Sequence, residues 1–109
     1  MSIKSSDNEI CRMDALTLAR RIKARDLSAL EATEAVLRRM DVLEPYVHAF
    51  CTPTPEHART AAKSIDAELA KGEAVGPLAG VPVGIKDLVA TKGIKTVMGS
   101  VLYKDFVPD

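Results

Sequence analysis

The stretch Gly76–Asp87, which reads Gly-Pro-Leu-Ala-Gly-Val-Pro-Val-Gly-Ile-Lys-Asp, constrains the fold of this chain more than any other segment. Val81, Val83 and Ile85 alternate with a proline and a glycine. This pattern predicts a short, mostly buried strand whose glycine permits close backbone approach. The strand ends on Lys86, at the point where the chain leaves the core.

Two interpretations of Lys86 follow from local chemistry. Burial disfavours the charged ammonium form, so a lysine held at the strand end without a carboxylate partner can serve as a base. Alternatively, the side chain reaches water and pairs with Asp87, as most lysines remain solvated.

A longer pattern bears on this choice, because Gly93-Ile-Lys-Thr96 and Gly99-Ser100 follow the Gly76–Asp87 block. Together these motifs closely resemble the amidase signature family, and the segments upstream extend the resemblance to about residues 13–109. The resemblance implies a single large α/β body several times longer than 109 residues. This chain would be its N-terminal portion, ending before the glycine- and serine-rich signature.

The resemblance also implies a catalytic set of a serine nucleophile, a second serine on a cis peptide bond, and a lysine. Lys86 matches the family's lysine by its place in Gly-Ile-Lys-Asp. Both serines would belong to a stretch downstream of Asp109. Ser100 follows a glycine and is interpreted as a structural turn residue rather than as a nucleophile. Asp87 is expected to order the turn. No cofactor or metal is predicted.

The implied function is hydrolysis of a carboxylic amide C–N bond, with a small-molecule amide as substrate. One alternative is the glutaminase (A) subunit of a tRNA-dependent amidotransferase, which residues 91–96 resemble, although Lys92 and Lys95 are interpreted as a solvated loop. An alternative of another class is a truncated, non-enzymatic interaction module. The expected partners are the remainder of the amidase chain or a complementing chain, with a homo-oligomer as a further possibility.

Composition excludes several classes of function. The chain has 15 basic and 15 acidic residues in 109, so its formal charge is zero. Binders of nucleic acid or membrane surfaces rely on a basic excess, so neither partner is expected. No secretion signal or apolar run of about 20 residues is present, which predicts a cytoplasmic protein. Cys11 and Cys51 lack metal-site spacing and are expected to be reduced thiols.

Three helices are predicted upstream of the lysine. The first begins near Met13. The second begins with a capping box at Ser28–Glu31 and ends near Glu44, because Pro45 disfavours helical geometry before it. The third begins at Thr54-Pro55 and ends at Lys71-Gly72. Its apolar stripe is rich in alanine and should lie close against the surface it covers: Ala58, Ala61, Ala62, Ile65 and Leu69.

The segment from Tyr46 to Cys51 can bury both faces, which predicts a core strand. His48 lies within it and is expected to be packed or hydrogen-bonded rather than a catalytic base. His57, in the first turn of the third helix, is expected to be exposed.

The predicted architecture is therefore α/β, in which the helices pack on a mixed sheet to which this chain contributes one or two strands. Residues 1–9 are expected to be disordered, residues 13–72 mainly helical, and residues 76–109 to form a strand and the catalytic-lysine loop. A sheet with unfilled edges needs strands from elsewhere. The 109 residues alone are thus expected to be marginally stable, oligomeric, or folded only beside the rest of the protein.

Overall fold

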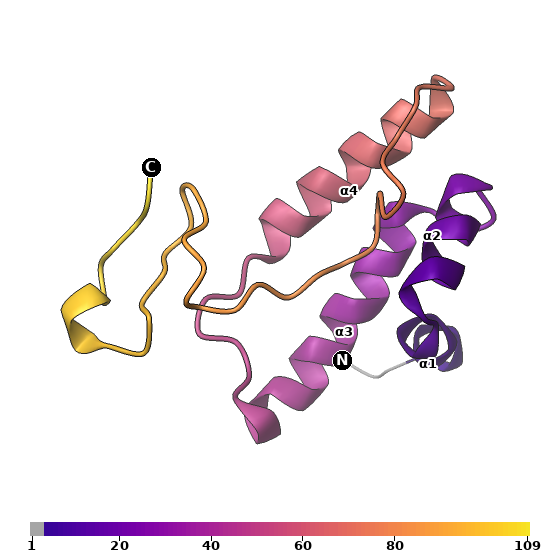
Figure 1. Cartoon of the computed structure of the whole chain (residues 1–109). Helices are drawn as coiled ribbons and strands as arrows, with labels where there is room; N and C mark the ends of the chain where they lie inside the picture. Colours follow the sequence, from indigo (N-terminus) through magenta and orange to yellow (C-terminus); the bar gives the residue numbers. More distant parts are fainter. Residues whose placement is uncertain (1–3) are drawn as a thin grey trace.

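The computed structural model describes residues 4–109, and within them it contains four α helices, one short 3-10 helix and no β strand. The elements are α1 (Ser5–Arg12), α2 (Ala15–Lys23), α3 (Ala29–Val47), α4 (Pro55–Ala70) and η1 (Val101–Tyr103). In Figure 1, α3 lies between α4 on one side and α1 and α2 on the other. The predicted mixed sheet is not formed by residues 4–109.

The hydrophobic core lies where α2, the beginning of α3 and the middle of α4 meet. Its buried members are Leu18, Ile22, Leu27, Ala29, Ala32 and Ala62. Small alanine side chains on α3 and α4 let the two helix axes approach closely. Ala62 is the buried member of the predicted alanine stripe, whereas Ala61 is exposed.

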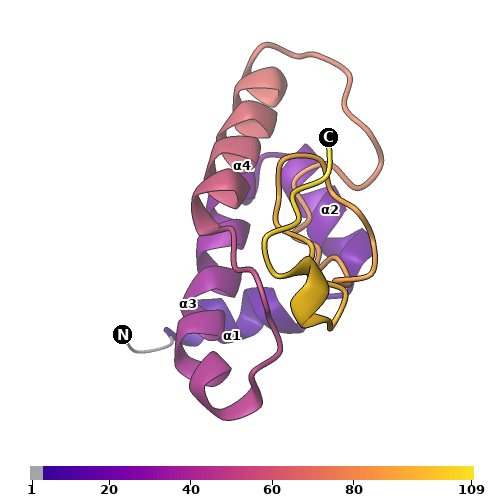
Figure 2. The same ribbon diagram turned by 90° about the vertical axis from the view of Figure 1, so that its left-hand side faces the viewer.

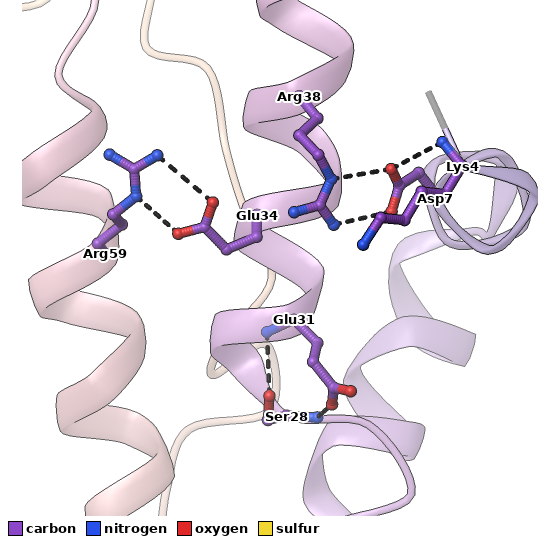
Figure 3. A network of polar contacts seen from close by, with 7 residues as sticks. All are labelled: Lys4, Asp7, Ser28, Glu31, Glu34, Arg38 and Arg59. Atoms are coloured by element: carbon purple, nitrogen blue, oxygen red, sulfur yellow. Dashed lines mark hydrogen bonds and ion pairs between the residues drawn. The ribbon is translucent and has the colours of Figure 1, made fainter. Parts of the chain in front are cut away.

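The beginning of α3 is tightly capped. The predicted capping box is confirmed, since Ser28 Oγ accepts from the Glu31 amide at 3.0 Å and the Glu31 carboxylate accepts from the Ser28 amide at 2.8 Å (Figure 3). Asp66 of α4 adds a second cap, because its two carboxylate oxygens accept from the amides of Ala29 at 2.7 Å and Leu30 at 3.0 Å. These bonds satisfy amide groups that a helix leaves without partners at its first turn.

Ion pairs join α3 to the helices on either side of it (Figure 3). Arg38 reaches the buried Asp7 carboxylate of α1, and Glu34 accepts from Arg59 of α4 at 2.6 Å. The hydrogen bond from the Arg59 guanidinium holds the pKa of Glu34 below its ordinary value. The orientation of α3 relative to both neighbours is therefore specified by charge as well as by packing.

Three local predictions were wrong. Residues 5–9 belong to α1 rather than being disordered, because Asp7 is anchored to Arg38; residues 1–3 lie outside the described part of the chain. Helix α3 continues through Pro45 to Val47, since the His48 amide still bonds to the Glu44 carbonyl at 2.9 Å. The predicted core strand over residues 46–51 is absent, because its first two residues are helical and residues 46–51 are largely exposed.

After Gly72, whose φ of 75° suits the predicted helix end, the chain runs back beside the helices and then projects away from them (Figures 1 and 2). The radius of gyration is 15.2 Å, compared with about 13 Å for a compact domain of about 100 residues. The C-terminal part, residues 82–109, is thus an arm that lacks a hydrophobic core of its own.

Candidate active-site lysine loop

The lysine segment, residues 80–89, is anchored to the helices at Gly80 and Val81. Gly80 has a φ of 83°, and a Cβ placed there would lie 2.8 Å from the Ala29 Cβ and 3.0 Å from the Ile22 Cγ2. Only glycine fits this position without displacing the core. Val81 packs against the same core cluster. The base of the segment is therefore fixed against the first turn of α3.

Beyond Val81 the segment is extended but unpaired. Val83 is 78 % exposed and Ile85 is 55 % exposed, so the predicted buried strand is not formed within residues 4–109. Gly84 lies over the Phe50 ring, which is 3.6 Å from the position of an added Cβ. A strand requires ladder partners and a covering layer, and these residues have neither.

Lys86 opens a tight turn that is closed by a hydrogen bond from the Val89 amide to the Lys86 carbonyl at 2.9 Å. The lysine side chain is exposed. No carboxylate within the described chain lies at ion-pair distance from its ammonium group. The Lys86 amine is thus presented at the surface of the arm without a counter-ion.

Asp87 orders this turn, as expected. Its Oδ1 atom accepts a hydrogen bond from the Val97 amide at 3.0 Å, which ties the lysine turn to a segment ten residues further along the chain. Its Oδ2 atom is buried and has no hydrogen-bond partner among the described residues. The sequence did not point to Val97, because no local pattern specifies a bond between a side chain and a backbone amide across a loop.

The remainder of the arm is held by backbone hydrogen bonds. Gly93 donates to Pro108 at 2.8 Å and Thr96 donates to Phe106 at 3.0 Å, so residues 93–96 run beside residues 106–108. Ser100 Oγ accepts from the Leu102 amide at 3.2 Å and caps η1. This contact agrees with the interpretation of Ser100 as a residue that stabilises a turn.

The other candidate residues lie outside the turn of residues 86–89. His48 was expected to be packed or hydrogen-bonded; it is exposed at the end of α3 with a φ of 47°, so it is not packed. His57 is exposed as expected. Cys11 and Cys51 are free thiols, and burial raises the pKa of Cys11. Lys92 and Lys95 are exposed, as expected for a solvated loop.

Residues 4–109 hold no cluster of three or more side chains suited to a metal ion. None of their helices combines the length and the apolar composition that crossing a membrane requires.

Comparisons with known proteins agree on one family. The family described as Amidase matches residues 31–109. Among curated relatives, the (A) subunit of the glutamyl-tRNA(Gln) amidotransferase of Acidothermus cellulolyticus is 44 % identical over 101 residues, which is 93 % of this chain and 20 % of the relative. The protein of the same name from Acaryochloris marina is 48 % identical over 84 residues, which is 77 % of this chain and 17 % of the relative.

A solved structure is also similar. It is described as "An unexpected vestigial protein complex reveals the evolutionary origins of an s-triazine catabolic enzyme. Inhibitor bound complex.". One of its chains matches with a TM-score of 0.83 and 31 % identity, covering 89 % of this chain and 21 % of that one. The chain therefore spans about a fifth of the length of the curated relatives and of the solved structure that it matches.

Proposed function

Because this chain belongs to the amidase signature family, we propose that it supplies the catalytic lysine of an amidase and that Lys86 is that lysine. The observation that carries the proposal is the presentation of the Lys86 side chain at the start of a tight turn, with no ion-pair partner among residues 4–109. Covering this turn with the rest of a domain would remove the amine from water and favour its neutral form.

The chemistry follows from the family resemblance. The neutral amine of Lys86 accepts a proton through the bridging serine, and the nucleophilic serine attacks the amide carbonyl. Backbone amides of the glycine-rich loop stabilise the oxyanion. The departing nitrogen takes up the proton, and water then releases the acyl group from the serine. Both serines and that loop lie outside the 109 residues, so this chain acts only within a longer protein or beside a complementing chain.

The mixed sheet belongs to the same proposal. The extended residues Val81–Ile85 become a strand when neighbouring strands hydrogen-bond to their free edges. The exposure of Val83 and Ile85 supports this, because covering apolar side chains favours assembly. The covering partner is the remainder of the amidase body, and a second copy of this chain is the alternative.

The curated relatives favour a second candidate function. Both relatives described above are (A) subunits of glutamyl-tRNA(Gln) amidotransferases. In this case glutamine is the amide, and the ammonia released at the serine passes to a companion chain instead of into solution. The two candidates share Lys86 and differ in partner dependence.

The first experiment is the intact mass and peptide map of the protein purified from its native source. A mass several times 11.7 kDa, with peptides that contain a glycine- and serine-rich loop, supports the proposal. That protein is then assayed for ammonia release from glutamine and from small aliphatic and aryl amides, with and without co-purifying chains. Activity on simple amides without partners identifies a hydrolase, whereas strict dependence on a companion chain identifies an amidotransferase component. Finding a protein of 11.7 kDa without a complementing chain contradicts both and favours a binding module.

A further inference from the structure

The Asp87 carboxylate is the one side-chain group in the described chain that has a buried oxygen without a hydrogen-bond partner. A carboxylate oxygen shielded from water and left without a donor destabilises a protein, and more so when the group is charged. Such an atom in a functional segment calls for a physical explanation.

The other oxygen of Asp87 already has a structural role. Oδ1 accepts from the Val97 amide at 3.0 Å. The backbone around Val97 is itself held, because the neighbouring Thr96 is 2 % exposed and its amide donates to the Phe106 carbonyl at 3.0 Å. Asp87 therefore attaches the lysine turn to a part of the arm that is itself held by backbone hydrogen bonding.

Lys86 is not the partner of the second oxygen, since no ion pair joins it to a carboxylate in residues 4–109. Around the Lys86–Asp87 pair, three apolar side chains are exposed: Ile85 at 55 %, Leu88 at 61 % and Val89 at 56 %. The turn thus combines one unpaired acceptor with exposed apolar side chains suited to being covered by protein.

We propose that Asp87 is a positioning residue that holds Lys86 through two hydrogen bonds: Oδ1 to the Val97 amide, and Oδ2 to an N–H or O–H donor of the remaining amidase body. The second bond forms only when that body packs on the turn and the residues that enclose Oδ2 in this chain move to admit the donor. It couples assembly of the domain to the placement of the Lys86 amine. The inference rests on the proposed function of Lys86.

The test uses the full-length enzyme that contains this segment, with Asp87→Ala and Asp87→Asn variants. Asparagine keeps an oxygen for the Val97 amide but places an NH₂ group where Oδ2 lies, facing the donor. Both variants should therefore lower kcat by about 10- to 100-fold, the value of one hydrogen bond to a charged group, with little change in KM. Asp105→Asn is the matched control, because Asp105 is an exposed aspartate on the same arm and should leave kcat unchanged.

Hydrogen exchange of the Val97 amide supplies a readout besides activity. It should be slow in the wild type and in Asp87→Asn, and faster in Asp87→Ala. Wild-type kcat in Asp87→Asn overturns the role of Oδ2, and wild-type kcat in Asp87→Ala overturns the whole inference. If Asp87→Ala fails to fold, Asp87→Asn decides, because it retains the Val97 bond. Full activity in a Lys86→Ala variant would instead overturn the proposed function, and the exchange result would still report on the Asp87–Val97 bond.

Discussion

The carboxylate of Asp7 in α1 and the guanidinium of Arg38 in α3 form a bidentate ion pair across 31 residues, with Nε–Oδ2 and Nη2–Oδ1 distances of 2.9 and 2.8 Å. Asp7 is 1 % exposed, and its Oδ2 atom also accepts from the Lys4 amide at 3.1 Å. This ion pair holds a polar N-terminal segment against α3, where the segment forms helix α1.

The Asp7–Arg38 pair predicts a specific acid sensitivity. The hydrogen bonds from Arg38 lower the pKa of Asp7 from its ordinary value of 3.8 to about 2. The pair therefore contributes fully to the free energy of unfolding above pH 3.8, and this contribution is lost as the pH falls through about 2. Asp7→Asn should lower stability at neutral pH and flatten the pH dependence in this window. The measurement is denaturant unfolding of the complete enzyme between about pH 5 and pH 2.

The control for that experiment is Glu9→Gln. Glu9 is also on α1, but its pair with Arg21 is long, at 3.5 Å, and exposed. Its loss should change stability by less than about 1 kcal/mol. Equal pH profiles for the wild type and Asp7→Asn would contradict the assignment.

Removing the Asp66 carboxylate should destabilise the beginning of α3. Asp66→Ala leaves the amides of Ala29 and Leu30 without their acceptors, and loss of a helix cap costs about 0.5–2 kcal/mol. Asp41→Ala is the matched control, because Asp41 is an exposed aspartate on α3. Amide hydrogen exchange in the first turn of α3 should accelerate only in Asp66→Ala. Unchanged protection there would show that Ser28 alone suffices as the cap.

Gly80→Ala should displace the base of the lysine segment. The added Cβ meets the Ala29 Cβ at 2.8 Å in a backbone with a φ of 83°, so overpacking of about 1–3 kcal/mol adds to backbone strain. Gly93→Ala separates the two effects, because Gly93 has a φ of 73° but open space around it. Thermal unfolding of the complete enzyme should rank the wild type above Gly93→Ala and Gly93→Ala above Gly80→Ala. Equal midpoints for the two variants would exclude the steric contribution.

Lys86→Ala in the complete enzyme should reduce kcat at least about 100-fold, the lower range for loss of a general base, while leaving the unfolding transition nearly unchanged. The folded state is expected to tolerate the change because the Lys86 side chain is exposed and unpaired in the described chain. Lys92→Ala is the control, since Lys92 is an exposed lysine six positions later on the same arm. Turnover that survives in Lys86→Ala would remove Lys86 from the catalytic set.

The 109 residues in isolation should associate or unfold without cooperativity. Large apolar side chains of the arm are exposed, including Val83, Val101 and Leu102 at 78, 83 and 88 %. Exposed apolar area of this kind promotes association. Sedimentation and chemical unfolding provide the measurements. A monomer with a single cooperative transition would contradict this expectation.

The starts of α3 and α4 were predicted correctly because their signals are local, whereas α1 was missed. The capping box at Ser28–Glu31 lies where it was expected, and α4 begins at Pro55 as the Thr54-Pro55 pair indicated. The end of α3 was predicted at Glu44 but lies at Val47. Pro45 disfavours helical geometry in the residue before it, and this preference is offset because later residues complete another hydrogen-bonded turn. The predicted strands do not form within residues 4–109, because alternation of apolar residues favours a strand only where another strand can pair with it.

Residue types at short, fixed spacing were enough to identify the family, the starts of α3 and α4, and the lysine motif. The partners of long-range contacts could be identified only from the folded structure. Asp66 caps α3, and Arg38 pairs with Asp7. Gly80 leaves room for the Ala29 side chain, and Asp87 accepts a hydrogen bond from the Val97 amide. These partners lie 10 to 51 residues apart, and no local propensity distinguishes the chosen partner from others of the same chemistry. Packing of the helices selects them, because a buried polar group is stable only where its complement arrives at hydrogen-bond distance.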